Sequence, residues 1–249
     1  MSAPAPSGAI LAAQVRNELR LSLRQGEQLL VSLGIPLLLL VFFSLVDVLP
    51  VPDGVTEPVD FLAPGILALA VMSTAMVSLG IGTGFDRQYK VLKRLGVSPL
   101  GRTRLVVAKI AMVLVVEAIQ VVLISATAFA LGWRPSATAA LAVPAVLAGT
   151  AAFAGIGLLM AGTLKGTLTL ALANGLYLVL LLLGGMIIPL ESLPAPLEAV
   201  ARLLPAAALS EVLGASLTSG DAASAQAWTV LVVWAVAAPV VAAARFRWE

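Results

Sequence analysis

Six long apolar stretches, separated by short polar connections, constrain this chain more than any other feature of its sequence. Each is about as long as the ~20 residues that an α-helix needs to cross the ~30 Å hydrocarbon core of a bilayer. Six such runs in 249 residues leave little room for a soluble domain, so the sequence predicts an all-α polytopic membrane protein with one domain, residues 1–249. The predicted spans are residues 29–49, 61–85, 105–131, 137–160, 168–189 and 228–244.

The composition narrows the functions that such a protein can perform. Only 11% of the residues are charged and 60% are hydrophobic, whereas about a quarter of the residues of a soluble domain are charged. The chain has no cysteine and no histidine, which excludes disulfides and thiol nucleophiles and removes the commonest general base. We therefore expect no catalytic residue, cofactor or metal in this chain, and nothing favours nucleic-acid binding.

The basic residues are clustered on one side of the predicted spans. The opposite side is acidic and has only Arg134 and Arg202 as basic residues. By the positive-inside rule, the basic side is the cytoplasm, so both termini are predicted to be cytoplasmic. Since the richness in alanine, valine, leucine and glycine is typical of a high-GC bacterial genome, we expect the membrane to be a bacterial inner membrane. The basic side carries Arg16, Arg20, Arg24, Arg87, Lys90, Lys93, Arg94, Arg102, Arg104, Lys165, Arg245 and Arg247.

Residues 10–28, before the first span, have the pattern of an amphipathic helix. Apolar residues from Leu11 to Leu23 recur at i, i+4 spacing, and Arg16, Arg20 and Arg24 form a basic stripe beside them. This pattern favours a helix that lies in the cytoplasmic interface, with its arginines toward lipid phosphates. The alternative is a solvated lead-in helix with snorkelling arginines.

The densest polar stretch is DRQYKVLKRLGVSPLGRTR, residues 86–104. Asp86 can cap a helix N-terminus, while Gly96 and the Ser98-Pro99 pair can end a helix. The stretch therefore predicts a short amphipathic cytoplasmic helix over residues 86–98. The alternative is a basic loop that only sets the orientation.

Four prolines punctuate the connection between the fifth and sixth spans, which is nevertheless strongly apolar. An external loop of this composition would not be stable in water. We expect two short helices, within residues 195–217, that dip into the outer leaflet or pack between the spans.

Glycines are concentrated in the second and fourth predicted spans. Residues 80, 82 and 84 are glycines in the second span, and the fourth has a small-xxx-small pair at Ala151 and Gly155. Since no strand precedes them, a phosphate-binding loop is not indicated. They predict close helix–helix approach or a bend.

Three features together resemble the permease subunit of type-2 ABC exporters, in the branch that includes drug and antibiotic resistance. They are the amphipathic helix before the first span, the short amphipathic helix after the second span and the proline-punctuated apolar connection after the fifth span. The most specific stretches are LKRLGVSPLGR, residues 92–102, and GGMIIPLESLPAPLEAVARLLPAAALSEVL, residues 184–213. The resemblance covers nearly the whole chain in order and spacing.

The resemblance implies that the helix at residues 86–98 is a coupling helix, seated in a groove of an ATP-binding subunit. The chain has no Gly-x-x-x-x-Gly-Lys-Ser/Thr loop, so ATP and Mg²⁺ are expected on that partner. Two permeases, in a homodimer rather than a heterodimer, would pair with two ATPases among the membrane lipids. The residues expected to couple to the ATPase are Asp86, Arg87, Tyr89, Lys90, Leu92, Lys93, Arg94 and Leu95.

Two pairs of polar residues lie within the predicted spans. Glu117 is an acid near the middle of the third span, and Gln120 lies one turn on, on the same side. They can line a substrate path or bond across a dimer, or Glu117 can lock two spans together. Asn174 and Tyr177 form a similar pair in the fifth span, for which interhelical hydrogen bonding is the favoured interpretation.

The favoured function is ATP-driven export of a hydrophobic or amphiphilic substrate, such as a drug, an antibiotic or a lipid. One alternative is a lipid-linked glycan exporter permease of the same family. Another is an ion-coupled secondary transporter that uses Glu117 as the proton carrier, although no inverted repeat is visible in the sequence.

Overall fold

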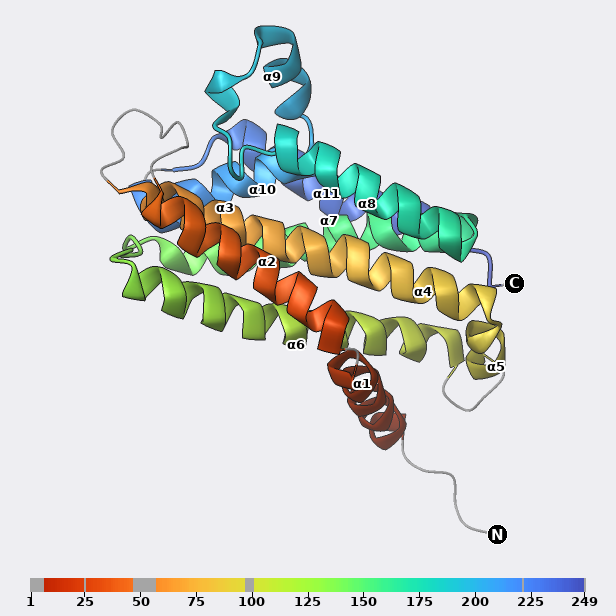
Figure 1. Cartoon of the computed structure of the whole chain (residues 1–249). Helices are drawn as coiled ribbons and strands as arrows, with labels where there is room; N and C mark the ends of the chain where they lie inside the picture. Colours follow the sequence, from red (N-terminus) through yellow and green to blue (C-terminus); the bar gives the residue numbers. More distant parts are fainter. Residues whose placement is uncertain (1–6, 25, 47–56, 97–100, 221, 249) are drawn as a thin grey trace.

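The computed structural model describes residues 7–24, 26–46, 57–96, 101–220 and 222–248. Helices and turns account for these residues and no strand occurs among them, which confirms the all-α fold class. The long helices lie side by side in a bundle, with the C-terminus and α5 at one end (Figure 1). Helix α1 leaves the bundle at a steep angle beneath α6, and α9 projects on the opposite side (Figure 1).

The α-helices alternate with a few short 3₁₀ and π-helical stretches. Their bounds are α1 Ser7–Arg24, α2 Gly26–Leu45, α3 Pro58–Met72, α4 Leu79–Gln88, α5 Val91–Gly96, α6 Gly101–Ala130, α7 Ala142–Thr163, α8 Gly166–Leu183, α9 Ala195–Ala201, α10 Pro205–Gly214 and α11 Ala225–Arg245.

Five helical segments of the described chain are long and apolar enough to cross a membrane: Pro58–Gln88, Thr103–Ala130, Ala139–Thr163, Gly166–Leu183 and Ala225–Arg245. They correspond to the second to sixth predicted spans. The first predicted span corresponds to α2, whose described apolar part is Ser32–Leu45, and its predicted end lies outside the described residues. Helices α9 and α10 form a pair bent by 85°, as expected for two short external helices rather than a straight span.

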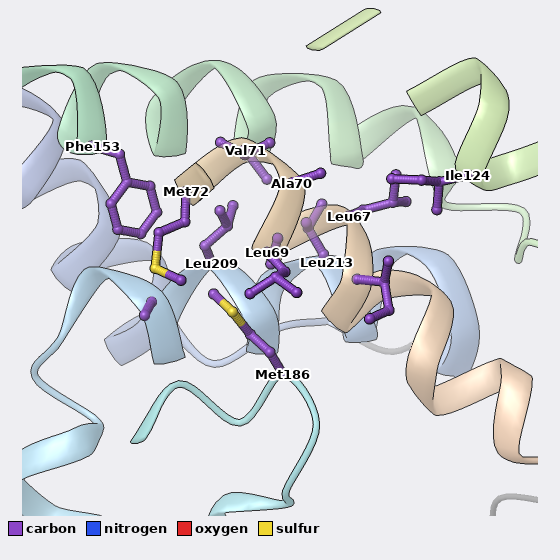
Figure 2. Packing of buried hydrophobic residues seen from close by; sticks show 14 of the residues in the cluster. Leu67, Leu69, Ala70, Val71, Met72, Ile124, Phe153, Met186, Leu209 and Leu213 are labelled. Carbon is purple, nitrogen blue, oxygen red and sulfur yellow. The ribbon is translucent and has the colours of Figure 1, made fainter. Parts of the chain in front are cut away.

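The segment Pro58–Gln88 forms the centre of the bundle. It joins α3 and α4 through a π-helical stretch, Ser73–Ser78, without a break in the helix. In its most apolar window 83% of the residues are buried, against 22% in α8 and α11. Figure 2 shows its side chains packing against Met186, Leu209 and Phe153 from other parts of the chain.

Glycines on α4 and α7 permit the close helix approach that the sequence predicts. A Cβ built on Gly157 would lie 2.6 Å from the carbonyl oxygen of Met76, and one on Gly155 would lie 2.5 Å from the backbone nitrogen of Pro239. Gly80 lies against the backbone of Gly157. Gly82 differs, because no atom lies within 4 Å of its Cβ position.

Helix α8 ends earlier than the sequence predicts. The prediction of a span to residue 189 is wrong at this end, since the helix stops at Leu183 and Gly185 adopts a φ of +64°. Glycine accepts this left-handed conformation without a Cβ penalty. The chain then turns back over the bundle, where the Ser210 hydroxyl donates to the Gly185 carbonyl oxygen at 2.9 Å. Helix α10 is therefore packed between spans, against α3, α7 and α11.

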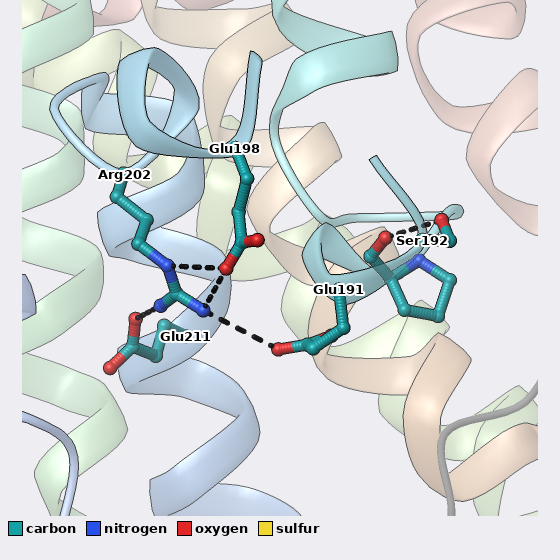
Figure 3. A network of polar contacts seen from close by, with 6 residues as sticks. Glu191, Ser192, Glu198, Arg202 and Glu211 are labelled. Carbon is teal, nitrogen blue, oxygen red and sulfur yellow. Dashed lines mark hydrogen bonds and ion pairs between the residues drawn. The ribbon is translucent and has the colours of Figure 1, made fainter. Parts of the chain in front are cut away.

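A polar cluster joins α9, α10 and the short 3₁₀ turn at Leu190–Ser192 (Figure 3). The Arg202 guanidinium donates twice to Glu198, at 2.9 and 2.7 Å, and lies 3.6 Å from a Glu211 oxygen and 3.7 Å from a Glu191 oxygen. The hydrogen bond to Glu198 raises the pKa of Arg202 above its ordinary value. Since the Arg202 side chain is 35% exposed, each pair contributes at most about 1 kcal/mol, and the cluster mainly fixes the orientation of α9 relative to α10.

Candidate functional site

The predicted coupling helix begins five residues later than expected. Helix α4 runs through Asp86 and Arg87 to Gln88, the chain turns at Tyr89 and Lys90, and α5 begins at Val91. Lys90 has a φ of +61°, a conformation that costs a non-glycine residue roughly 1–2 kcal/mol. Asp86 therefore does not cap the short helix, and residues 97 and 98 lie outside the described residues.

Asp86 instead takes part in a three-residue ion cluster that the sequence did not reveal. Lys109 of α6 lies with its Nζ 2.7 Å from Asp86 Oδ2 and 3.2 Å from Glu18 Oε2 of α1. The Glu18 carboxylate also accepts a hydrogen bond of 2.9 Å from Gln14 Nε2. The side chains of Lys109 and Glu18 are only 8% and 11% exposed. This cluster links α1, α4 and α6 at the predicted cytoplasmic end of the bundle.

Arg87 is likewise turned toward the bundle. Its guanidinium donates to the carbonyl oxygens of Gly162 and Leu164, the latter at 2.7 Å, where α7 ends. It also lies 3.4 Å from the Arg247 carbonyl oxygen, and the Arg247 backbone nitrogen donates to Gly162 at 3.1 Å. Arg87 thus satisfies carbonyl groups that the end of a helix leaves without an intrahelical partner.

Helix α5 is anchored through its apolar face. Leu92 is 1% exposed and packs with Leu105 of α6. The rings of Phe246 and Trp248, 4.9 Å apart, and Ile10 of α1 complete this small cluster. Helix α5 therefore packs against three separate parts of the chain.

The eight predicted coupling residues fall into two groups. Asp86 and Arg87 are partly buried and engaged as described, while Leu92 is buried and Leu95 is half-buried. The exposed side chains are those of Tyr89, Lys90, Lys93 and Arg94. This second group forms an exposed aromatic and basic surface.

The intramembrane pair Glu117 and Gln120 makes contacts with different helices. The Thr150 hydroxyl of α7 donates to Glu117 Oε2 at 2.7 Å. Gln120 accepts from Thr74 in the π-helical stretch at 2.9 Å and donates to the Ser32 carbonyl oxygen of α2 at 3.0 Å. Each side chain is 2% exposed, so within one chain both residues lie at helix–helix contacts.

Replacing Glu117 by glutamine should leave both the thermal stability and the transport rate close to those of the wild type. An amide oxygen can accept the Thr150 hydrogen bond as a carboxylate does, and Glu117 is buried between α6 and α7. We expect a change of less than about 1 kcal/mol in the free energy of unfolding, measured by thermal unfolding beside vesicle transport. Stable protein that no longer transports would instead assign the carboxylate a role in transport.

Asn174 and Tyr177 on α8 are not joined to another helix by a hydrogen bond in the described part of the chain. The Asn174 amide donates to the Leu170 carbonyl oxygen of its own helix at 2.9 Å, and the side chain is exposed. Tyr177 is half-buried against the main core. Asn174 therefore lies on the exposed face of α8.

Among these contacts, sequence reasoning missed Glu18 and Lys109. A signal existed for Lys109, because a lysine inside an apolar run needs a partner or an aqueous cavity. Nothing in the spacing pointed to Glu18, which lies 91 residues from Lys109.

The family model described as ABC-2 type transporter matches residues 11–217, which include the ion cluster, α5 and the outer helices. Comparison with curated proteins gave no match.

Proposed function

This chain belongs to the ABC-2 type transporter family, and we propose that it is the permease of an exporter that moves a hydrophobic or amphiphilic substrate outward. ATP hydrolysis by a separate ATP-binding subunit would drive the transport. The observation that carries this proposal is α5, a short helix packed at one end of the bundle with Lys93 and Arg94 exposed, beside the exposed Tyr89 and Lys90 of the preceding turn.

The anchoring of α5 supports its role as the coupling helix. A force on α5 would reach the central span directly, because only Tyr89 and Lys90 separate α5 from α4. It would reach α6 through the contact of Leu92 with Leu105. The same end of the bundle carries Arg87, whose contacts extend the connection to α7 and the C-terminal segment.

We also propose that this end faces the cytoplasm of a bacterium, with both termini inside. The distribution of lysine and arginine supports this orientation. A docked ATPase would then reach α5, while α9 and α10 would lie at the outer surface.

Charge reversal on α5 should separate the permease from its ATPase. Tagged protein purified from its host in mild detergent should carry an ABC ATPase in equal amount. Lys93→Glu combined with Arg94→Glu should reduce its retention by about tenfold or more, because like charges would then face an acidic partner surface.

Lys165→Glu is the matched control, since Lys165 is exposed in the turn between α7 and α8 and lies outside α5. Retention should stay at the wild-type level in this variant. A wild-type permease that purifies alone would contradict the proposal, and equal retention in both variants would remove α5 from the docking surface.

A second permease copy is proposed to pack on α8. Asn174 lies near the middle of this helix with its amide exposed, and Gly175 beside it has no atom within 4 Å of its Cβ position. An exposed amide in hydrocarbon gains from an interhelical hydrogen bond, and a neighbouring glycine lets two backbones approach. In a two-fold interface, each Asn174 would meet the same residue of the other copy.

Because the chain has no cysteine, any disulfide formed by Asn174→Cys must come from the introduced residue, so this variant tests the interface directly. Mild oxidation in membranes should convert most of the variant to a disulfide-linked dimer, since symmetric cysteines near the axis reach the ~4.4–6.8 Å Cα separation of a disulfide. Val232→Cys, at an exposed position on α11, should remain monomeric on a denaturing gel. Cross-linking of Val232→Cys and not of Asn174→Cys would move the interface to α11.

A further inference from the structure

A deep apolar groove runs between α6, α7 and α11, apart from the docking surface on α5. Its volume is about 720 Å³, within the range of ~300–1,000 Å³ that is typical of ligand sites. Small residues and longer aliphatic side chains line it together. These include Ala151, Gly155, Ala243, Val107, Leu114 and Leu147.

Along α6 the groove is about as long as one bilayer leaflet is thick. Along α6 it extends from Thr103 to Leu114, a rise of about 16 Å at ~1.5 Å per residue. Half of the ~30 Å hydrocarbon core is about 15 Å. Its lining includes Val107 and Leu147, which are 45% and 51% exposed, so the groove opens on the side of the bundle.

At the end of the groove near the C-terminus, aromatic and basic residues replace the aliphatic ones. Phe246 and Trp248 line it there, as aromatic residues do at a membrane interface. The same segment carries Arg245 and Arg247, both exposed. An arginine near the surface of a membrane attracts anionic lipid headgroups.

We propose that this groove is a binding site for an anionic phospholipid. An acyl chain fills the apolar groove to the level of Leu114, and the headgroup phosphate lies near the exposed Arg245 at the end of α11. The leaflet, predicted to be the cytoplasmic one, follows from the proposed orientation. The site itself depends neither on that orientation nor on transport.

Trp248 provides the readout, because bromine on an acyl chain quenches only a tryptophan that it contacts. The transporter is reconstituted in zwitterionic lipid with a small fraction of brominated phosphatidylglycerol or, in parallel, brominated phosphatidylcholine. The contribution of Trp248 is the difference between the wild type and Trp248→Phe. We expect the anionic lipid to produce the same quenching at a mole fraction about fivefold lower, or lower still, than the zwitterionic lipid requires. The reason is the attraction of one to two arginines for its headgroup.

Two adjacent alanines on α11 give a matched pair of variants. Both are exposed, but only Ala243 lines the groove. Ala243→Phe should lower Trp248 quenching to the level expected from bulk lipid, and Ala244→Phe should keep the wild-type response. Arg245→Gln with Arg247→Gln should abolish the preference for the anionic lipid, whereas Arg134→Gln should not.

Equal quenching by the two lipids would overturn the proposal, as would equal responses of the two phenylalanine variants. A second copy of the chain in the groove would also overturn it. In that case Trp248 would be shielded from both lipids, and Ala243→Cys would form a disulfide between copies.

Discussion

Replacing Lys109 by methionine should destabilise the protein by about 3 kcal/mol, because the change leaves two carboxylates without their shared cation. Within the described residues, Glu18 would keep its hydrogen bond from Gln14 but no cation, with its side chain 11% exposed. Asp86 would suffer less, since its side chain is 34% exposed. The expected loss is therefore at the lower end of the ~3–5 kcal/mol range for breaking a buried ion pair.

Thermal unfolding of the purified protein measures this effect as a fall of about 6–12 °C in Tm. Adding Glu18→Gln to Lys109→Met should restore much of the loss, because the buried charge without a partner is then removed. Lys165→Met, at an exposed lysine, should change stability by no more than about 0.5 kcal/mol. If Lys109→Met behaved like this control, the ion cluster would contribute nothing to stability.

Hydropathy and charge were sufficient to predict the all-α membrane architecture, since both depend on local sequence alone. They also indicated the two short helices between the fifth and sixth spans, because prolines and apolar residues coincide there. The end of α8 at Leu183 was missed. Gly184 and Gly185 belong to the same apolar run, and only packing against α3 and α10 decides that the chain turns there.

The candidate site was harder to predict because its contacts join residues distant in the sequence. Periodicity placed Asp86 at the start of a short helix, whereas Lys109 holds it within α4. The turn at Lys90 carries no glycine or proline, so no turn signal marked it. Likewise, helical spacing put Glu117 and Gln120 on one side, yet each bonds to a different neighbouring helix.

Replacing Gly65 by alanine should also cost about 3 kcal/mol, the upper part of the usual range for overpacking a core. A Cβ at this position would lie 2.0 Å from the carbonyl oxygen of Met186 and 2.8 Å from its carbonyl carbon. Both atoms belong to the backbone, so no side-chain rotation can relieve the contact. Either α3 or the segment after α8 must move.

The segment after α8 is also bound to α10, so it cannot easily move away from a Cβ at position 65. The loss of stability should therefore be large. The Ser210 hydroxyl of α10 donates to the Gly185 carbonyl oxygen, and α10 packs against α3 and α7. A fall in Tm, with faster proteolysis of the outer helices, is the expected result. The matched control is Gly82→Ala, because Gly82 has open space at its Cβ position and alanine favours a helix by ~1 kcal/mol. Equal stability of the two variants would show that the outer segment moves aside freely.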